Sequence, residues 1–401
     1  MKDQTIGIYM HIPFCVKKCP YCSFNSIKNT NLPEDFYIDA LLKELAYYIH
    51  GTPELSGKRL ETVYIGGGTP SLISPGGIKR LLRGIAKKFN PTGVPFTLSL
   101  SPKGRGEGEG EITLEVNPGT VTFEKLLQFK QAGVNRLSIG VQSFHEKSLN
   151  ALGRIHTVKD ALVCYENAKK VGFNNTGIDL ISCIPGQTIS EWNADLERAI
   201  SLRPQHISAY TLTIEKDTPF FRLNKDGRLL LPSEEEQLEM FEFTIDRLTS
   251  AGYNHYEVSN YSLQGFESRH NNRYWDSMDY IGLGAGAHSY RSSPDWGVRW
   301  WNMSLPGYYI KSINNSGQAI AGVEKLTEEE AITEGIFLGL RKINGIDLNW
   351  FSKRFNKSLK ECHAGRIPEL ITEGFITETE DRLSLTRKGL LLADSVISQL
   401  I

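Results

Sequence analysis

The sequence predicts an α/β fold: a partial (β/α)6 barrel over about residues 1–230, followed by a small C-terminal α+β domain. Six short apolar runs alternate with longer amphipathic stretches, a pattern typical of right-handed βαβ units on a parallel sheet. Six units fall short of the eight that close a (β/α)8 barrel, so we expect an open, splayed, TIM-like barrel.

The expected elements of the barrel follow each other in regular alternation. The β-branched apolar runs that predict strands are 6–12, 62–65, 112–116, 136–141, 177–184 and 206–213. The stretches with apolar residues at helical spacing are 32–50, 75–89, 122–132, 157–171 and 190–202. Because a helix separates successive strands, we expect a parallel sheet.

Three cysteines follow the first expected strand in a CxxxCxxC spacing: Cys15, Cys19 and Cys22. This spacing suits three irons of a 4Fe-4S cluster and leaves the fourth iron open, whereas an electron-transfer cluster normally has four cysteine ligands. Structural zinc is the main alternative, but zinc sites usually come as paired halves. The remaining cysteines are scattered singly and supply no second half: Cys164, Cys183 and Cys362.

The composition favours a cytoplasmic protein. The 401 residues carry a formal net charge of -1, which gives no global reason to expect a nucleic acid partner. The few cysteines indicate a reducing compartment and no disulfide scaffold. No signal-peptide profile is evident at the N-terminus, and no stretch approaches the roughly 18 apolar residues of a membrane span. We therefore expect no intrinsic membrane segment.

Residues with useful chemistry stand where the expected strands end. Cys15 follows the first strand, the glycine run 66–70 follows the second, and Glu115 ends the third. Gln142 ends the fourth, and Asp179 lies on the fifth. Each has an ordinary structural explanation alone, as a turn or a helix cap, but functional groups of β/α barrels gather at this rim. Together the glycines, carboxylates and amide suit an adenosyl amino acid such as S-adenosylmethionine (SAM).

On these residues the sequence resembles the radical SAM superfamily, and within it the branch of oxygen-independent coproporphyrinogen dehydrogenase and the HemW heme chaperones. The resemblance covers nearly the whole chain. It is carried by Tyr-Met-His-Ile-Pro-Phe-Cys from Tyr9, Gly-Gly-Gly-Thr-Pro-Ser from Gly66, Ser-Ile-Gly-Val-Gln-Ser-Phe from Ser138, Leu-Gly-Arg ending at Arg154, and Asp-Leu-Ile-Ser-Cys-Ile-Pro-Gly-Gln-Thr from Asp179.

The resemblance implies ligand sets but no catalytic residue. The three cysteines of the CxxxCxxC loop would ligate a 4Fe-4S cluster. The residues implied to surround SAM are Tyr9, Tyr21, Gly67, Gly68, Thr69, Glu115, Gln142, Arg154 and Asp179.

Three features favour the heme chaperones over the porphyrinogen-oxidising enzymes. Those enzymes resemble CxxxCxxCxC, and the position of their fourth cysteine is Phe24 here. They also carry an N-terminal arm that helps to cover the substrate, whereas only 14 residues precede Cys15. Finally, residues 270–275 match the HNxxYW motif that marks the HemW branch and is implicated there in heme binding.

The motif implies that His270, Tyr274 and Trp275 contact heme, and imidazole is a standard axial ligand. A lone histidine beside aromatic residues is nevertheless more often a hydrogen-bonded packing residue. His288, in Gly-Leu-Gly-Ala-Gly-Ala-His-Ser-Tyr, is a rival ligand because small neighbours allow a flat ligand to approach. The three scattered cysteines are further candidates, although their settings favour ordinary burial.

Residues 231–320 are expected to form a family-specific extension, and 321–401 a winged-helix-like domain. The expected elements of that domain are helices over 327–341, 349–355, 366–373 and 387–400 and a hairpin of 375–377 with 383–386. Winged helices often bind DNA, but this segment mixes acids and bases, so we expect it to cover the barrel or meet a partner protein. The glycine-rich, polar segment 98–110 reads as an inserted loop without a catalytic role.

The expected function is that of a heme chaperone, which binds heme and transfers it to an apo-heme acceptor protein, with a respiratory complex as one option. The cofactors are a 4Fe-4S cluster, SAM and heme, and whether SAM is cleaved stays open. The alternative is a radical SAM enzyme that decarboxylates coproporphyrinogen III. Either function is compatible with a homodimer in which a cluster or a heme bridges the two chains.

Overall fold

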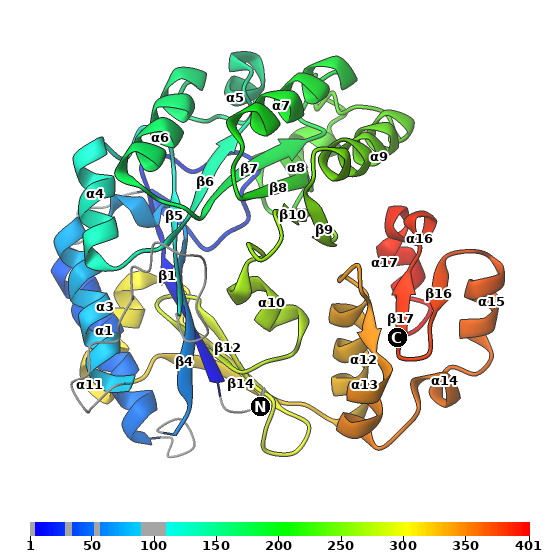
Figure 1. Cartoon of the computed structure of the whole chain (residues 1–401). Helices are drawn as coiled ribbons and strands as arrows, with labels where there is room; N and C mark the ends of the chain where they lie inside the picture. Colours follow the sequence, from blue (N-terminus) through cyan, green and yellow to red (C-terminus); the bar gives the residue numbers. More distant parts are fainter. Residues whose placement is uncertain (1–4, 29–33, 52–56, 90–109) are drawn as a thin grey trace.

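The computed structural model describes residues 5–28, 34–51, 57–89 and 110–401 (Figure 1). It contains one large sheet that carries the helices of the barrel, and a small separate domain at the C-terminal end. The predicted insertion at 98–110 lies outside the described residues except for Gly110, which precedes the third barrel strand.

Six neighbouring parallel strands form the centre of the sheet and confirm the predicted open barrel. In spatial order they are β1 (Thr5–Ile12), β4 (Arg59–Gly67), β5 (Glu111–Val116), β6 (Arg136–Gln142), β7 (Thr176–Ser182) and β8 (His206–Thr211). Their apolar side chains are buried against the surrounding helices in one continuous core. Parallel neighbours of this kind bring all carboxyl-terminal strand ends to one rim.

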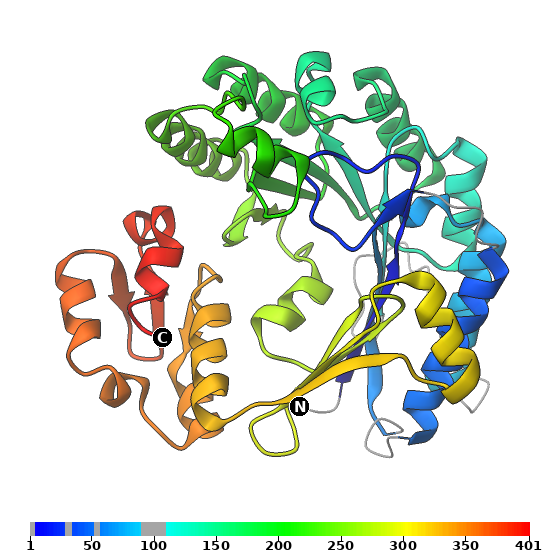
Figure 2. The same cartoon turned by 180° about the vertical axis from the view of Figure 1, so that it is seen from behind.

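The helices between these strands cover the outer face of the sheet (Figures 1 and 2). They are α1 (Glu34–Gly51), α3 (Pro75–Phe89), α4 (Phe123–Ala132), α6 (Val158–Val171) and α7 (Ile189–Leu202). Local signals set their ends: Thr157 and Asp160 form a capping box that begins α6, and Gly172 ends it with φ of 89°. Thr188 and Glu191 form the same box at the start of α7.

Residues beyond 230 extend the same sheet at both edges. On the β1 side, β11 (Tyr280–Leu283) is parallel to β1, and β12 (His288–Arg291), β13 (Val298–Asn302) and β14 (Ile320–Lys325) continue antiparallel. On the β8 side, β10 (Asn260–Ser262) and β9 (Asn254–Glu257) are antiparallel. The helices α8 (Pro219–Lys225), α9 (Glu234–Ser250), α10 (Arg269–Trp275) and α11 (Pro306–Ser316) connect them. Figure 1 shows α10 between the sheet and the C-terminal domain.

The C-terminal domain has its own core and a three-stranded antiparallel sheet, in the order β15 (Ile346–Asp347), β17 (Arg382–Leu385), β16 (Ile376–Glu378). Its helices are α12 (Glu328–Gly339), α13 (Leu348–Phe355), α14 (Leu359–Cys362), α15 (Arg366–Thr372), α16 (Arg387–Leu391) and α17 (Ala393–Ile397). The predicted single helix over 387–400 is wrong, because Leu392 leaves helical geometry with φ of -121° and ψ of 31°. The apolar spacing continues across this break, so periodicity does not reveal it.

Short elements complete the rim. Residues 14–28 carry the three cysteines and are called the cluster loop, after the cluster that their spacing predicts. This loop begins in β2 (Phe14–Cys15) and ends in β3 (Ile27–Lys28), which pairs with β2. A 3-10 turn, η2 (Pro70–Leu72), follows the glycines that end β4. A short helix, α5 (Glu146–Ala151), follows β6.

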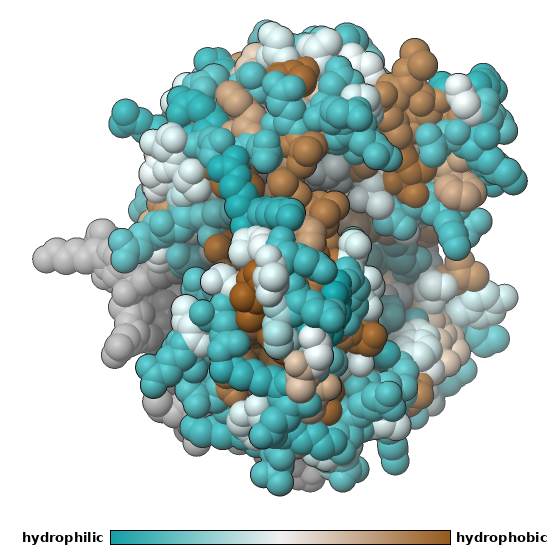
Figure 3. All heavy atoms as spheres, turned by 90° about the vertical axis from the view of Figure 1, so that its right-hand side faces the viewer, coloured by the Kyte–Doolittle hydropathy of each residue, from teal (hydrophilic) through white to brown (hydrophobic). Residues whose placement is uncertain are grey.

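The space-filling view shows apolar patches on an otherwise largely hydrophilic face (Figure 3). No helix among the described residues is long and apolar enough to pass through a bilayer.

Candidate functional site

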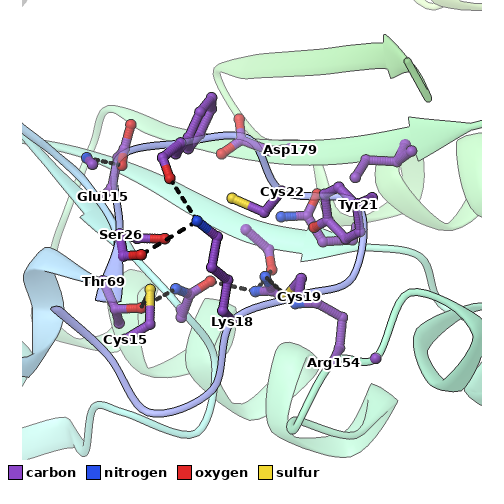
Figure 4. A pocket seen from close by; sticks show the side chains of 18 of the residues that line it. Cys15, Lys18, Cys19, Tyr21, Cys22, Ser26, Thr69, Glu115, Arg154 and Asp179 are labelled. Carbon is purple, nitrogen blue, oxygen red and sulfur yellow. Dashed lines mark hydrogen bonds between the residues drawn. The ribbon is translucent and has the colours of Figure 1, made fainter. Parts of the chain in front are cut away.

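A cavity of about 370 Å³ opens at the carboxyl-terminal rim of the barrel, beneath the cluster loop (Figure 4). It is lined by side chains from that loop and from the ends of β4, β5, β6, β7 and β8. Of the residues predicted from the sequence, those that line it are Cys15, Cys19, Tyr21, Cys22, Gly67, Gly68, Thr69, Glu115, Gln142, Arg154 and Asp179. The rim therefore gathers residues that are distant in the chain.

Tyr9 is the predicted SAM residue that lies outside the lining. Its ring centroid is 6.1 Å from that of Tyr64, and its hydroxyl bonds to His11 Nδ1 at 2.9 Å. The His11 ring bonds in turn to the Asn25 carbonyl oxygen at 2.7 Å. Tyr9 thus connects β1 to the far end of the cluster loop.

Two of the three loop cysteines, Cys15 and Cys19, accept hydrogen bonds at sulfur. Thr69 Oγ1 donates to Cys15 Sγ at 3.5 Å, and an Arg154 nitrogen donates to Cys19 Sγ at 3.6 Å. Lys18 Nζ donates to the Phe24 and Ser26 carbonyl oxygens at 3.1 and 3.3 Å. Among the described residues no three histidine, cysteine or acidic side chains converge on a single ion position. A cubane cluster does not need such convergence, because each cysteine binds a different iron.

The glycine run allows β4 to pass directly beneath the cluster loop. A Cβ on Gly68 would lie 2.8 Å from the Phe14 carbonyl oxygen and 2.9 Å from Cys15 Sγ. Gly67 has φ of 116°, a conformation that residues with a side chain rarely adopt. A larger residue at position 68 would therefore push the cluster loop away from the rim, whereas one at position 67 would collide with the His11 ring on β1.

Two half-buried carboxyl groups, Glu115 and Asp179, line the cavity. Glu115 accepts hydrogen bonds from the Tyr64 hydroxyl at 2.8 Å and the Gly67 backbone N–H at 3.0 Å. Burial raises the pKa of Glu115 to about 7, and it raises the pKa of Asp179 as well. Asp179 accepts from the Ser138 hydroxyl at 2.9 Å and from the Ser208 hydroxyl at 2.7 Å. Such carboxyl groups can accept hydrogen bonds from ammonium and ribose hydroxyl groups.

Several lining residues were not identified from the sequence: Asn117, Thr120, Ser138, His156 and Tyr210. Asn117 lies two residues after Glu115 and accepts a hydrogen bond from the Arg154 guanidinium. Ser138 lies four residues before Gln142 on the same strand. Alternate residues of a strand point to the same face, so Asn117 and Ser138 could have been predicted by counting in steps of two from Glu115 and Gln142. No comparable local signal exists for His156.

His156 is buried beside the cavity. Its Nε2 bonds to the Val141 carbonyl oxygen at 3.1 Å, and its Nδ1 has no hydrogen-bond partner within the described part of the chain. Burial, together with the nearby Arg154 cation, lowers its pKa to about 4. The imidazole is therefore neutral near pH 7.

The residues of the HNxxYW motif lie on α10, and none of its predicted heme contacts lines the cavity. His270 has no exposed surface, and its ring stacks on Tyr64 with centroids 5.2 Å apart. Its Nδ1 bonds to Thr62 Oγ1 at 2.8 Å, and its Nε2 bonds to the Tyr274 hydroxyl at 2.9 Å. Burial, followed by the cations Arg273 and Arg136, lowers its pKa to about 3. In this structure neither ring nitrogen of His270 is available to iron.

The other candidate heme ligands have different surroundings. His288 is exposed at the start of β12 and stacks on Trp301 with ring centroids 5.9 Å apart. Cys164 and Cys183 are buried, whereas Cys362 is exposed on α14. Burial raises the pKa values of the Cys164 and Cys183 thiols, so both stay protonated near neutral pH.

Family models match both the barrel and the C-terminal domain. A model of the radical SAM superfamily matches residues 9–199, and a model of the HemN C-terminal domain matches residues 326–392. The fold superposes with a TM-score of 0.80 on coproporphyrinogen III oxidase (HemN) from Escherichia coli, a radical SAM enzyme. The two are 22% identical, and the match covers 100% of this chain and 91% of that chain. At that identity the likeness shows the fold.

Curated relatives match over essentially their whole length. The chain is 36% identical over 401 residues to the heme chaperone HemW of Lactococcus lactis subsp. lactis (strain IL1403), covering 100% of this chain and 98% of that protein. It is 37% identical over 388 residues to the heme chaperone HemW of Bacillus subtilis (strain 168), covering 97% of each. Identity to the heme chaperone HemW of Escherichia coli (strain K12) is 33%, over 99% of this chain and 98% of that protein.

Proposed function

The chain belongs to the HemW family within the radical SAM superfamily, and from that premise we propose that it binds heme and transfers it to an apo-heme acceptor protein. The observation that carries this proposal is similarity to heme chaperones along the entire chain. Phe24, at the position of the fourth cysteine of the porphyrinogen-oxidising enzymes, supports it. The proposed setting is the cytoplasm, where the cysteines stay reduced.

In this proposal Cys15, Cys19 and Cys22 bind three irons of a 4Fe-4S cluster, and the cavity beside them holds SAM. A cluster with SAM bound supplies one-electron reduction of the sulfonium. The chain's own groups prepare the site: Thr69 and Arg154 direct hydrogen bonds to cysteine sulfurs. Hydrogen bonds to sulfur and nearby cations are general means of setting a cluster's potential.

Glu115, Asp179 and Gln142 hold the polar parts of SAM in this proposal. The carboxyl groups already carry hydrogen bonds from hydroxyl and backbone donors, which fix their orientation before any ligand arrives. Gln142 adopts φ of 70° at the end of β6, so its backbone leaves the strand direction at the cavity. A non-glycine residue in this region indicates a constrained position.

The second candidate function is oxidative decarboxylation of coproporphyrinogen III. The feature that favours it is the cavity itself, since the residues proposed to hold SAM and the cysteines proposed to bind the cluster line it together, as a radical enzyme requires. The same geometry serves a chaperone whose cluster and SAM control heme loading or release. The two functions differ in what happens to the tetrapyrrole.

One preparation tests both functions. The full-length protein is reconstituted anaerobically with iron and sulfide, and one portion is loaded with heme and mixed with an apo-heme protein. A second portion receives coproporphyrinogen III, SAM and a reductant. We expect heme to appear in the acceptor and porphyrinogen to remain unchanged. Decarboxylated product that depends on SAM, without heme transfer, would instead establish the enzyme and overturn the chaperone function.

A further inference from the structure

We propose that His288, at the start of β12, supplies the axial nitrogen to heme iron, with its ring held by Trp301. This inference rests on the proposed function, because it presupposes that the protein binds heme. It assigns iron ligation to a residue outside the HNxxYW motif. The ligand class is an iron porphyrin.

The first argument is the state of the two imidazoles. Both ring nitrogens of His270 are occupied by the Thr62 and Tyr274 hydroxyls, and the ring has no exposed surface. Coordination there would require breaking a buried hydrogen bond and opening the packing around Tyr64. In contrast, His288 is exposed, and nothing among residues 5–28, 34–51, 57–89 and 110–401 forms a hydrogen bond with its ring.

The second argument is that the His288 ring is oriented by a rigid neighbour. His288 pairs directly with Trp301 across the antiparallel strands β12 and β13, and their rings stack at an interplanar angle of 23°. Trp301 in turn pairs with Gly322 on β14. A Cβ on Gly322 would lie 2.2 Å from the indole, so only glycine permits this indole position. An imidazole held this way loses little further freedom when it binds a metal.

The stacking also suits the geometry of ligation. An axial imidazole stands roughly perpendicular to the macrocycle, with a nitrogen at its edge pointing to the iron. The indole covers a face of the His288 ring, so in this proposal the iron meets the edge of the ring. Partial burial and then Arg299 lower the pKa of His288. The neutral imidazole that binds metals is therefore the form present near pH 7.

The third argument is position. β11 is parallel to β1, so the segment after β11 lies at the same rim as the cluster loop. The Asn25 side chain donates to the carbonyl oxygens of Ala285 and Ser304, at 2.8 and 2.9 Å, and fastens the end of the cluster loop beside the turn that precedes β12. Figure 2 shows these yellow strands beside the dark blue β1.

Exposed apolar side chains flank this junction. Phe24, next to Asn25, is 63% exposed, and Leu305, next to Ser304, is 54% exposed. Such side chains offer contacts for the apolar body of a porphyrin. Iron ligation by His288 thus places heme at the edge of the cluster loop, where cluster and SAM can influence its release.

The test is an anaerobic titration with ferric heme of the reconstituted full-length protein, followed by absorbance and by electron paramagnetic resonance of the iron. The variants are His288→Ala, His288→Cys and His270→Ala, with His50→Ala as the matched control because His50 is an exposed histidine on α1. We expect His288→Ala to weaken heme binding at least tenfold and to remove the histidine-ligated signal. His288→Cys should give a thiolate-ligated spectrum, which only direct coordination produces. His50→Ala should match the wild type.

Two outcomes would overturn the assignment in different ways. Saturable heme binding by the wild type, with spectra unchanged in both His288 variants, overturns the ligand and leaves the chaperone function standing. No saturable binding by the wild type overturns both. If His270→Ala retains native circular dichroism and removes the histidine-ligated signal while His288→Ala keeps it, His270 is the ligand. A His270→Ala variant that does not fold changes nothing in the His288 comparison.

Discussion

The CxxxCxxC loop and the HNxxYW motif both contain residues that commonly bind metals, yet the fold treats them in opposite ways. The loop lies at the strand ends and borders an open cavity, with Cys19 and Cys22 half-buried. The motif lies on α10, where His270 is buried and both of its ring nitrogens already form hydrogen bonds. The difference teaches that tertiary packing decides whether a residue capable of binding a metal borders a cavity or packs against neighbouring side chains.

The largest expected effect is loss of the cluster on substitution in the loop. Cys15→Ala removes a thiolate that we propose binds one iron, so we expect iron and sulfide content after reconstitution to fall to background. Cys362→Ala, at an exposed cysteine on α14, is the control and should reconstitute fully. Full iron content in Cys15→Ala would contradict the proposal that the CxxxCxxC loop binds the cluster.

Stability should show the reverse contrast. His270→Ala leaves a cavity against Tyr64 and unpaired hydroxyls on Thr62 and Tyr274, which should cost about 3–5 kcal/mol of unfolding free energy. His288→Ala removes an exposed ring and should cost less than about 1 kcal/mol. Urea unfolding followed by circular dichroism measures both. Equal stability of the two variants would mean that the buried contacts of His270 do not stabilise the fold.

Glu115 at the cavity and His270 on α10 should contribute to the pH dependence of stability with opposite signs. The pKa of Glu115 is raised to about 7 from 4.5, so the folded state holds its proton more tightly and this contribution is lost as pH rises between these values. The pKa of His270 is lowered to about 3 from 6.5, so its contribution is lost as pH falls from 6.5 toward 3.

Urea unfolding without SAM at several pH values separates these contributions. Glu115→Gln should flatten the fall in stability between pH 4.5 and 7 by up to roughly 3 kcal/mol, since each pKa unit corresponds to about 1.4 kcal/mol. His270→Asn should flatten the rise between about pH 3 and 6.5. Unchanged slopes in both variants would contradict the burial argument for both groups.

The smallest effect is expected from replacing an arginine with lysine, at Arg154 beside the cavity and at Arg273 on α10. One guanidinium nitrogen of Arg154 donates to Asn117 and to the Gly140 carbonyl oxygen at 3.3 Å, and another donates to Cys19 Sγ. Arg154→Lys keeps the charge but loses this arrangement of donors. We expect about tenfold weaker SAM binding, equal to about 1.4 kcal/mol, measured by equilibrium dialysis. Arg273→Lys, on α10, should lower stability but leave SAM affinity unchanged, because Arg273 bonds to Thr5 and the Asp279 carbonyl oxygen. A loss of SAM affinity in both variants would show that the two regions act as one site.

The barrel, the cysteine loop and most of the cavity were predictable because their signals are local. The alternation of apolar runs and helical stretches marks six parallel strands, and parallel strands bring their ends together whatever the side chains are. The glycines at 67 and 68 and the carboxyl groups of Glu115 and Asp179 could therefore be expected at one rim. The edge strands β9 to β14 carried no comparable signal, since they are short and their antiparallel pairing depends on distant partners.

The sequence by itself determined which residues are capable of binding a cluster, SAM or heme, because that capacity belongs to the side chain and its immediate spacing. Only the tertiary structure decided which of them are available. His270 bonds to Thr62, 208 residues away in the chain, and Arg154 reaches Cys19 across 135 residues. Neither contact can be predicted from the spacing of residues along a strand or helix. Whether a lone pair meets a ligand or a neighbouring hydroxyl depends on which distant segment packs against it.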